Sequence, residues 1–345
     1  MNVFEIDPTA DQRWDSFVRD HSQASIFHTR AWLRSLERTY GYKPCAAVTS
    51  QDGSRLSAAI PFCEVTGFFG KRRLVSLPFS DHCQPLFDTD EQLRSMTAHL
   101  RAKRDEEKWD YLELRPTNSI VRTLGLENSE RFVFHRLNLR RNPEEIFSSL
   151  HKDCVQRKVR RAEKAGVTVE EGTTDALLKK FYGLLVMTRR RHGLPAQPTQ
   201  WFRNLVSEFG SNLTISVAFS AGHPIAGIIT LLHNRTLVYK YGGTDQRFSS
   251  LGGMQLLLWG AIQRAMRDNL REFDLGRSDL ADPGLVIFKD RWGAEQSSLS
   301  YCRYGTMPST RLAKTYQSSI GKYVWAHTPK AVLTAAGRVL YRQLG

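Results

Sequence analysis

The sequence predicts an α/β fold of two domains, and three observations support this prediction. The chain has 345 residues, which is enough for two domains that each bury a hydrophobic core. Hydrophobic residues make up 41% of the chain and charged residues 24%, as is ordinary for a globular protein. Segments of helical periodicity alternate with short β-branched runs in both halves. We therefore expect each domain to hold a mixed, twisted sheet that is flanked by helices.

In the first half, the stretch before residue 25 is polar, and no element is predicted there. Beyond it, helical spacing of apolar residues predicts helices, and runs with a period of two predict strands. The predicted helices cover residues 25–40 and 91–108, and the predicted strands cover residues 43–49, 57–65, 74–79, 111–115 and 132–139. This alternation predicts an N-terminal α/β domain at residues 1–140.

The second half repeats the succession of helix, hairpin, strand, helix and strand, which is consistent with a duplicated fold. The predicted helices cover residues 143–166, 176–192, 200–209 and 254–269, and the predicted strands cover residues 167–170, 213–219, 225–232, 236–241 and 271–276. We expect Gly242 and Gly243 to end the strand 236–241. The segments 285–291 and 299–304 close this second domain, which is predicted to span residues 141–308.

The second domain is organised around residues 236–289, where a strand leads through a turn of small residues into a helix. Such a unit aims the first amides of its helix at an anion. The turn has the pattern R-x-x-S-x-G, in which glycine and serine let backbone N–H groups converge on a diphosphate and the arginine adds charge. We therefore assign Arg247, Ser250, Gly252 and Gly253 to the phosphate of a donor. The alternative is a glycine-rich helix start that serves only close packing.

The turn resembles the acyl-CoA-binding turn Q/R-x-x-G-x-G/A of the GNAT acyltransferase superfamily, with Ser250 in place of one glycine. Further segments resemble FemAB-related proteins and follow the order of that family from about residue 25 to residue 305. They are residues 27–33, 150–169, 224–227, 239–243 and 288–294, the last of which is similar to the FemAB pattern FK-x-x-(F/W)-G. The resemblance implies two GNAT-like domains in tandem and an acyltransferase activity.

The sequence disfavours a covalent or a metal-dependent enzyme. It holds no G-x-S-x-G elbow and no H-E-x-x-H spacing, and its histidines are scattered. Direct attack of an acceptor amine or hydroxyl on a bound acyl donor needs only positioning, polarisation of the carbonyl and a base. We therefore expect direct transfer without a metal.

Three residues are candidates for this chemistry. The resemblance implies that Lys289 contacts phosphate or the developing oxyanion, and the alternative is an exposed lysine whose stem lies on the surface. Asp274, at the end of a predicted strand, is a candidate base or orienting group for an acceptor amine, unless it pairs with Arg277 or caps the chain. Tyr241 is a candidate proton donor to the leaving group, unless it is a packed aromatic residue of its strand.

Basic residues gather on the predicted helix 143–166 and at the end of the predicted helix 176–192. Arg157 and Arg161 share one helical face, and Arg191 belongs to a run of three arginines. We assign Arg157, Arg161 and Arg191 to substrate binding. The alternatives are a solvated charged face and complementation of a helix C-terminus.

The formal net charge of +14 favours an anionic partner, such as a CoA ester, a nucleotide-linked lipid, tRNA or an anionic membrane. The five cysteines are odd in number and widely spaced, so we expect reduced thiols in a cytoplasmic protein. No signal peptide and no membrane-spanning stretch are predicted. Residues 309–345 form a basic tail, and residues 311–345 are predicted to be amphipathic helix, either in peripheral contact with the inner face of the membrane or packed on the protein.

Three functions follow from these observations. The main prediction is a cytoplasmic acyltransferase that moves an acyl group, other than an aminoacyl group, from acyl-CoA to an amine or hydroxyl of a cell-envelope or exopolysaccharide precursor. The alternative, which resemblance to FemA and FemX implies, is transfer of an amino acid from aminoacyl-tRNA to a peptidoglycan precursor. The third is a non-catalytic basic protein that binds membrane or nucleic acid, although no recognised nucleic-acid motif supports it.

Overall fold

The structure is a computed structural model that describes residues 2–67, 70–117, 124–305, 337 and 339–343. The chain divides into two compact units. The first comprises Met1–Phe132, Ser298–Thr310 and Val339–Gly345, and the second comprises Val133–Ser297 and Arg311–Arg338. Among residues 124–305, the chain passes between the units at two places, both of them inside long strands, β6 (Glu127–Asn138) and β12 (Glu295–Gly305). The division therefore falls inside strands, whereas the predicted boundaries at residues 140 and 308 follow them.

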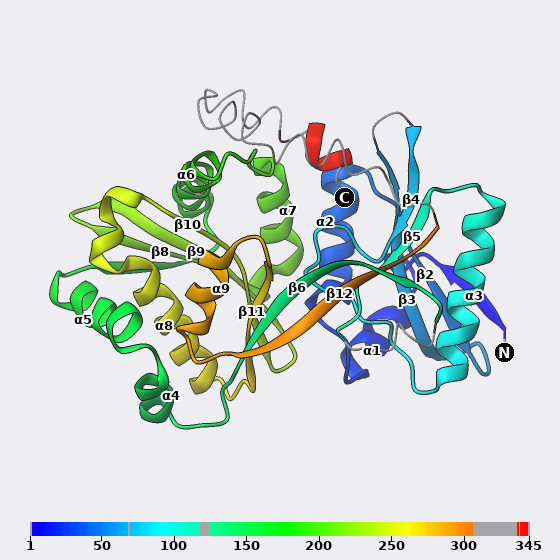
Figure 1. The fold of residues 1–345 in the computed structure, drawn as a ribbon, viewed down its shortest axis with the longest axis horizontal. Helices are drawn as coiled ribbons and strands as arrows, with labels where there is room; N and C mark the ends of the chain where they lie inside the picture. The colour runs from blue at the N-terminus through cyan, green and yellow to red at the C-terminus, as the bar shows by residue number, and fades with distance from the viewer. Residues whose placement is uncertain (1, 68–69, 118–123, 306–336, 338, 344–345) are drawn as a thin grey trace. The chain divides into compact units, whose positions relative to one another are not determined.

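The first unit is a sheet with helices (Figure 1). Its strands are β1 (Val3–Ile6), β2 (Pro44–Ser50), β3 (Leu56–Thr66), β4 (Arg72–Val75) and β5 (Tyr111–Leu114), and its helices are α1 (Arg13–Asp20), η1 (Ile26–His28), α2 (Arg30–Tyr40) and α3 (Asp90–Glu106). The hydrogen-bonded order is β1-β2-β3-β4-β5-β12, in which β4 and β5 pair in parallel. Thr89 starts α3 in a capping box with Gln92, and Leu93, Met96 and Leu100 bury one face of that helix in the core.

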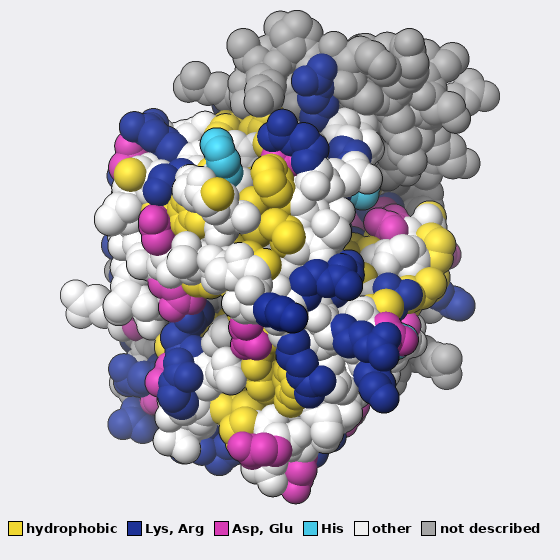
Figure 2. Space-filling model, turned by 90° about the vertical axis from the view of Figure 1, so that its left-hand side faces the viewer, with side chains coloured by type: hydrophobic (Ala, Val, Ile, Leu, Met, Phe, Trp, Pro, Cys, Tyr) yellow, Lys and Arg dark blue, Asp and Glu magenta, His cyan; other side chains and the backbone are white. Residues whose placement is uncertain are grey.

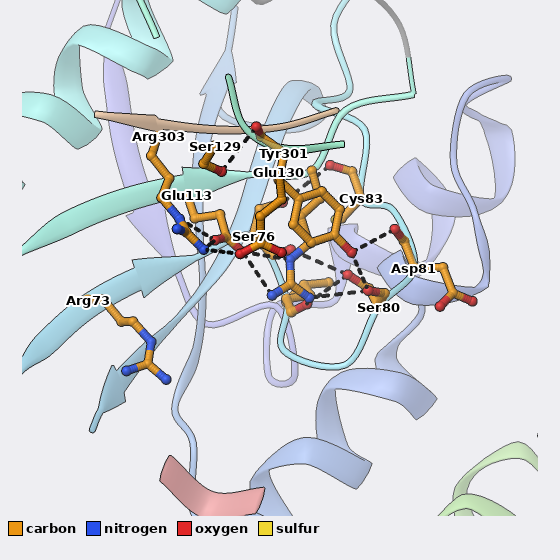
Figure 3. Close-up of polar contacts among 12 residues, drawn as sticks. Arg73, Ser76, Ser80, Asp81, Cys83, Glu113, Ser129, Glu130, Tyr301 and Arg303 are labelled. Atoms are coloured by element: carbon orange, nitrogen blue, oxygen red, sulfur yellow. Dashed lines mark hydrogen bonds and ion pairs between the residues drawn. The ribbon is translucent and has the colours of Figure 1, made fainter. Parts of the chain in front are cut away.

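Charged side chains are buried inside the first unit (Figure 3). The Glu113 side chain is 3% exposed and accepts hydrogen bonds from Arg115 Nε at 2.9 Å and Arg303 Nε at 2.7 Å. The Arg115 guanidinium also donates to the Leu77 carbonyl at 2.9 Å and lies over the Tyr301 ring. These groups satisfy one another, so the cluster fixes the ends of β5 and β12 against the loop that follows β4.

The end of the chain packs on the first unit. Tyr42 Oη donates to the carbonyl of Arg342 at 2.8 Å, Arg73 donates to the carbonyl of Gln343 at 2.6 Å, and Leu340 is buried. For residues 339–343 the structure thus agrees with the alternative of a segment that packs back on the protein. Most of the predicted tail, and with it the predicted membrane contact, lies outside the described residues.

The second unit is also a sheet with helices (Figure 1). Besides β6, its strands are β7 (Thr168–Gly172), β8 (Leu213–Ser220), β9 (His223–His233), β10 (Thr236–Thr244) and β11 (Glu272–Asp279). Its helices are α4 (Pro143–Ser149), the π-helix η4 (Lys152–Gln156), α5 (Arg157–Lys164), α6 (Asp175–Arg191), α7 (Thr199–Phe209), the 3₁₀ helices η5 (Gly210–Asn212) and η6 (Gln246–Leu251), α8 (Gly253–Arg267) and α9 (Pro283–Asp290). The strand order is β6-β11-β10-β9-β8-β7. The predicted α/β class with mixed, twisted sheets flanked by helices is confirmed.

Helices α6 and α8 cover opposite faces of the sheet of the second unit. Successive residues of a strand face opposite sides. On β9, Ala226 faces Gly253 of α8, whereas a Cβ on Gly227 would meet Phe181 of α6 at 3.1 Å. The core between sheet and α8 is continuous, with Leu258, Ile262 and their neighbours buried against β9 and β11.

The prediction that Gly242 and Gly243 end their strand is wrong, because β10 continues through both to Thr244 and pairs them with Ile228 and Gly227 of β9. Packing explains the glycines. A Cβ on Gly243 would lie 2.5 Å from the backbone nitrogen of Leu185, so only glycine lets α6 approach the strand this closely.

Candidate functional site

The site lies where strands β10 and β11 separate. The two strands pair in parallel only from Thr236–Glu272 to Val238–Asp274. Each strand continues beyond the last pair, β10 as far as Thr244 and β11 as far as Asp279. The sheet of the second unit is therefore open beside β10, next to the start of α8.

A pocket of about 560 Å³ occupies this region of the second unit. Five parts of the chain line it: the end of β10 with the start of β9, the end of α6, the start of α8 with η6, the helix α5, and α9. Its apolar wall includes Ile225, Tyr239, Phe248, Leu285 and Phe288. A hollow of this size with an apolar wall and a few charged groups is the usual form of a small-molecule site.

The charged groups of the pocket leave a surplus of positive charge. Lys158, Arg189 and Arg191 line it, together with the carboxylates of Asp245 and Asp282. Both carboxylates have partners, since Asp245 pairs with Arg247 at 2.6 Å and Asp282 accepts the N–H of Leu285 at 3.1 Å. Figure 2 shows Lys and Arg side chains around apolar side chains on one face of the molecule. The pocket thus offers cations to an anionic ligand.

Helix α8 begins at the pocket wall. Gly252 is its N-cap, has no side chain to cap the first turn, and adopts the left-handed conformation with φ +81°. The next three residues, Gly253, Met254 and Gln255, line the pocket. The first N–H groups of a helix have no partner within it, so this end of α8 is suited to an anion.

The predicted donor residues are only partly at the pocket. Gly253 lines it, but Arg247 extends into solvent with a side chain that is 78% exposed and paired with Asp245. The Ser250 carbonyl accepts Arg161 Nη1 at 3.3 Å, and a Cβ on Gly252 would lie 2.3 Å from the Lys158 carbonyl. Helix α5 therefore packs directly on the turn that was assigned to a diphosphate, which agrees with the packing alternative for Gly252.

Of the residues predicted to bind substrate, only Arg191 lines the pocket. Arg157 forms an ion pair with Asp153 at 2.7 Å on an exposed face. Arg161 is engaged with the turn, as described above. The basic face of α5 thus serves its contact with η6, and Lys158 is the residue of that helix that reaches the pocket.

Lys289 and Asp274 lie together in the interior of the second unit. Lys289 is 3% exposed, and its Nζ donates to the carbonyls of Gly276 at 2.9 Å and Arg277 at 2.8 Å. Asp274 is also 3% exposed, and its Oδ1 accepts the N–H of Gly276 at 2.6 Å. Lys289 is therefore not the exposed lysine of the alternative interpretation. Both side chains hold the part of β11 that has left β10, and their catalytic roles stay predictions.

Asp290, the residue after Lys289, forms a hydrogen bond with a histidine of β6. His135 Nε2 lies 2.9 Å from Asp290 Oδ1, and the His135 side chain is fully buried. Burial lowers the pKa of His135, and the Asp290 carboxylate opposes this effect. Helix α9 is thus fixed to β6 as well as to β11.

Tyr241 does not line the pocket. It is buried, and its Oη accepts the indole N–H of Trp201 at 2.8 Å from α7. Its neighbour Tyr239 lines the pocket instead, and the pairing of β10 with β9 shifts register between these two residues. Burial raises the pKa of Tyr239 to about 12. The predicted role of Tyr241 as a proton donor stays a prediction.

The sequence interpretation did not assign Lys158 or Tyr239 to the site, and it named Arg189 only as part of the arginine run that was a candidate for the acceptor site. For Arg189, the signal was the run of three arginines that ends α6. For Tyr239, it was the same aromatic pair on β10 that suggested Tyr241. Lys158 carried no signal, because only the packing of α5 on η6 brings it to the pocket.

A parallel pair of strands that separates beside a helix start, with helices on both faces, is consistent with the GNAT-like domain that the sequence predicts. In agreement, residues 151–283 match the family model described as "Acetyltransferase (GNAT) domain". The chain is also similar to UDP-N-acetylmuramoylpentapeptide-lysine N(6)-alanyltransferase of Weissella viridescens, with 26% identity over 145 residues, which are 41% of this chain and 42% of that protein. The match thus spans less than half the length of this curated relative.

Solved structures resemble most of the chain in fold. The crystal structure of FemX has a TM-score of 0.70 at 14% identity and covers 92% of this chain and 100% of its own. A tandem GNAT protein from the clavulanic acid biosynthesis pathway has a TM-score of 0.56 at 12% identity and covers 89% of this chain and 99% of its own. These likenesses concern the fold. Together, the comparisons support a relationship to FemAB-related acyltransferases of the GNAT superfamily.

Two further observations concern the described part of the chain. None of its helices has the length and apolar character that crossing a membrane requires. Nor do three or more His, Cys, Asp or Glu side chains gather there in a way that would hold a metal ion.

Proposed function

We propose that this protein transfers an amino acid from an aminoacyl-tRNA to an amine of a peptidoglycan precursor. The pocket of the second unit would take the aminoacylated 3′ end of the tRNA. The main prediction from the sequence excluded aminoacyl groups, and here we propose an aminoacyl group as the group that is transferred. The chemistry stays within the acyltransferase class that the comparisons support.

The observation that carries the proposal over acyl-CoA transfer is the packing of α5 on the turn before α8. A diphosphate cradle needs open backbone amides. Here the Lys158 carbonyl fills the space beside Gly252, and Arg161 is bonded to the Ser250 carbonyl. The cations that face the pocket are instead side chains, those of Lys158, Arg189 and Arg191. The name of the similar alanyltransferase supports the same choice.

The proposed reaction is a direct attack. The acceptor amine nitrogen attacks the ester carbonyl carbon, the bond between that carbon and the ribose oxygen breaks, and an amide forms. The amine loses one proton, and the ribose oxygen gains one. The pocket cations would hold the phosphates of the donor, and the aromatic wall of Tyr239, Phe248 and Phe288 would stack on its terminal base. We retain Asp274 as a candidate base and Lys289 as a candidate partner of the oxyanion.

A second candidate is transfer from acyl-CoA to an amine or hydroxyl of an envelope or polysaccharide precursor. The observation that favours it is the start of α8, whose first turn faces the pocket and has no side-chain cap. An acyl-CoA diphosphate placed there would accept N–H groups from Gly253 and Met254.

Thermal denaturation in the presence of ligands separates the two candidates, because a ligand that binds the folded state raises the melting temperature. The probes are CoA, acetyl-CoA and a non-hydrolysable analogue of the aminoacylated 3′-terminal adenosine of tRNA, extended on its 5′ side by the nucleotides that precede it. We expect a shift with the analogue and none with millimolar CoA. A shift with CoA or acetyl-CoA alone would overturn the proposal in favour of the second candidate.

A further inference from the structure

The second unit has another hollow, of about 800 Å³, at the opposite end of α8 from the pocket described above. Five arginines line this hollow, which we call the arginine basin. They are Arg140, Arg141, Arg235, Arg267 and Arg271. No carboxylate is among the described residues that line it. Arginine is the side chain that pairs with phosphate through two parallel hydrogen bonds.

The basin is built on backbone contacts between three parts of the sheet. It gathers the end of β6, the turn between β9 and β10, and the start of β11. The Leu139 N–H donates to the Arg271 carbonyl at 2.9 Å, and the Arg271 N–H donates to the Arg235 carbonyl at 2.8 Å. The backbone positions of Arg235, Arg271 and the segment that leads to Arg140 are therefore fixed, while the guanidinium groups extend into solvent.

Complementation of the helix dipole explains at most one of these arginines. Arg267 lies in the last turn of α8, where a cation is favourable. The other four belong to no helix, and in the described part of the chain no ion pair engages any of the five, whereas nearby Arg136 pairs with Glu272 at 3.4 Å. Five like charges around one hollow repel one another, so binding an anion there is favourable.

The position of the basin relates it to the pocket. Gly253 at the start of α8 lines the pocket, and Arg267 at its end lines the basin. A rise of 1.5 Å per residue places these two sites about 20 Å apart. A single ligand that occupies both must span this distance and present negative charge at each end, as a nucleic-acid chain does.

We propose that the arginine basin binds the phosphodiester backbone of RNA, namely the body of the tRNA whose 3′ end enters the pocket. This inference rests on the proposed function for the identity of the RNA. A membrane surface fits the basin less well. Binding at a membrane surface combines cations with exposed apolar side chains, and the large exposed apolar residues of the described chain, Val169, Leu280, Leu285, Ile287 and Val339, lie elsewhere.

The test uses the full chain and two triple variants that remove the same charge. The basin variant is Arg140→Gln, Arg235→Gln and Arg271→Gln. The control variant is Lys179→Gln, Lys180→Gln and Arg203→Gln, three exposed cations in ion pairs on α6 and α7. Binding of deacylated tRNA is measured by fluorescence anisotropy over a range of salt concentrations, with circular dichroism as the check of folding.

We expect the basin variant to bind tRNA at least about tenfold more weakly and to show a salt dependence that is shallower by about 2 to 3 in log–log slope, while the control stays within about threefold of wild type. Equal binding by wild type and basin variant would overturn the proposal. So would a basin variant that keeps tRNA binding but no longer sediments with phosphatidylglycerol vesicles, which would assign the basin to a membrane.

A second measurement separates this inference from the proposed function. A short aminoacyl-oligonucleotide that carries only the 3′ end of tRNA reaches the pocket but not the basin. We expect the basin variant to use this short donor like wild type and to show a KM for full aminoacyl-tRNA that is raised about tenfold. If the basin variant had wild-type KM values for both donors, the proposed role of the arginine basin would be contradicted. If the wild-type enzyme transferred nothing from either donor, the proposed function would be contradicted instead. The comparison of tRNA binding would still show whether the arginine basin binds RNA.

Discussion

In the first unit, the carboxylate of Glu113 lies buried between two guanidinium groups (Figure 3), whereas in the second unit Lys158 and Arg189 line an open pocket. The difference lies in the partners. Arg115 and Arg303 satisfy one buried carboxylate, so that each group depends on the others. For Lys158 and Arg189, in the described part of the chain, no carboxylate takes that place. In this protein, buried and paired charged side chains therefore stabilise the fold, whereas the cations that line the pocket are available to a ligand.

The largest effect is expected at the buried cluster. Glu113→Gln removes the charge that compensates Arg115 and Arg303, and we expect a loss of about 3–5 kcal/mol in the free energy of unfolding. Chemical denaturation measures this loss. The control is Glu130→Gln, which removes the exposed partner of Arg303 and should change stability by less than about 1 kcal/mol. Equal effects of the two substitutions would remove the distinction between buried and exposed charge.

The same cluster predicts a dependence on pH. Burial acts to raise the pKa of Glu113, but Arg115 and Arg303 outweigh it and hold the pKa below the ordinary value of 4.5. Because the folded pKa is the lower one, this stabilisation is complete above pH 4.5 and is lost as the pH falls through the folded pKa. We expect the Glu113→Gln variant to show a flatter decline of stability below pH 4.5 than wild type in denaturation at several pH values.

Lys289 is buried and hydrogen-bonded like the cluster of the first unit, but it bonds neutral carbonyls, so we expect an intermediate effect. Lys289→Met leaves the Gly276 and Arg277 carbonyls without their donor, which costs about 1–3 kcal/mol of stability. Turnover should fall as well, since α9, which carries Lys289, lines the pocket through Leu285 and Phe288. Lys152→Met, at an exposed position on η4, serves as the control. Unchanged stability in Lys289→Met would contradict the structural part of this account, and unchanged turnover would remove Lys289 from the site.

Two glycines of the α8 region sharpen the interpretation of the turn. Gly252→Ala places a Cβ 2.3 Å from the Lys158 carbonyl at a positive φ, so we expect a loss of about 1–2 kcal/mol or more. Gly260→Ala, within the same helix and with no atom near the new Cβ, should stabilise the protein by about 0.5–1 kcal/mol. Denaturation of both variants measures the difference. A neutral Gly252→Ala would show that α5 is not tightly packed on the turn.

The smallest effect on stability is expected at the pocket. Arg189→Gln with Arg191→Gln should change the free energy of unfolding by less than about 0.5 kcal/mol. The KM for the donor should rise about tenfold or more, because hydrogen bonds to charged phosphates are lost. Lys179→Gln with Lys180→Gln, on the same helix, should change neither quantity. A large loss of stability in the arginine variant would place these side chains with the buried cluster of the first unit.

Local patterns predicted most of the fold, because amphipathic spacing and β-branched runs persist in the structure. The start of the chain was an exception. Strand β1 and helix α1 are short, and only Trp14 and Val18 of α1 are buried, so the segment resembles a polar one. The pair Gly242–Gly243 misled for a different reason, since these glycines accommodate α6 and do not break the strand.

The site was harder to predict than the fold. Gly253 and Arg191 were predicted and line the pocket, because the first belongs to a helix start and the second to a basic helix end. Lys158 could not be predicted, since its place depends on how α5 packs on a turn about 90 residues further along the chain. Contacts of this kind are determined by tertiary packing and leave no local pattern.

The most direct test of the central claim is the identity of the group that is transferred. Purified protein is incubated with UDP-N-acetylmuramoyl pentapeptide and either charged tRNA or acetyl-CoA, and the peptide product is analysed by mass spectrometry. We predict that the lysine amine of the peptide gains an aminoacyl group from charged tRNA and gains nothing from acetyl-CoA. An acetylated peptide with acetyl-CoA, and an unchanged peptide with charged tRNA, would contradict the account.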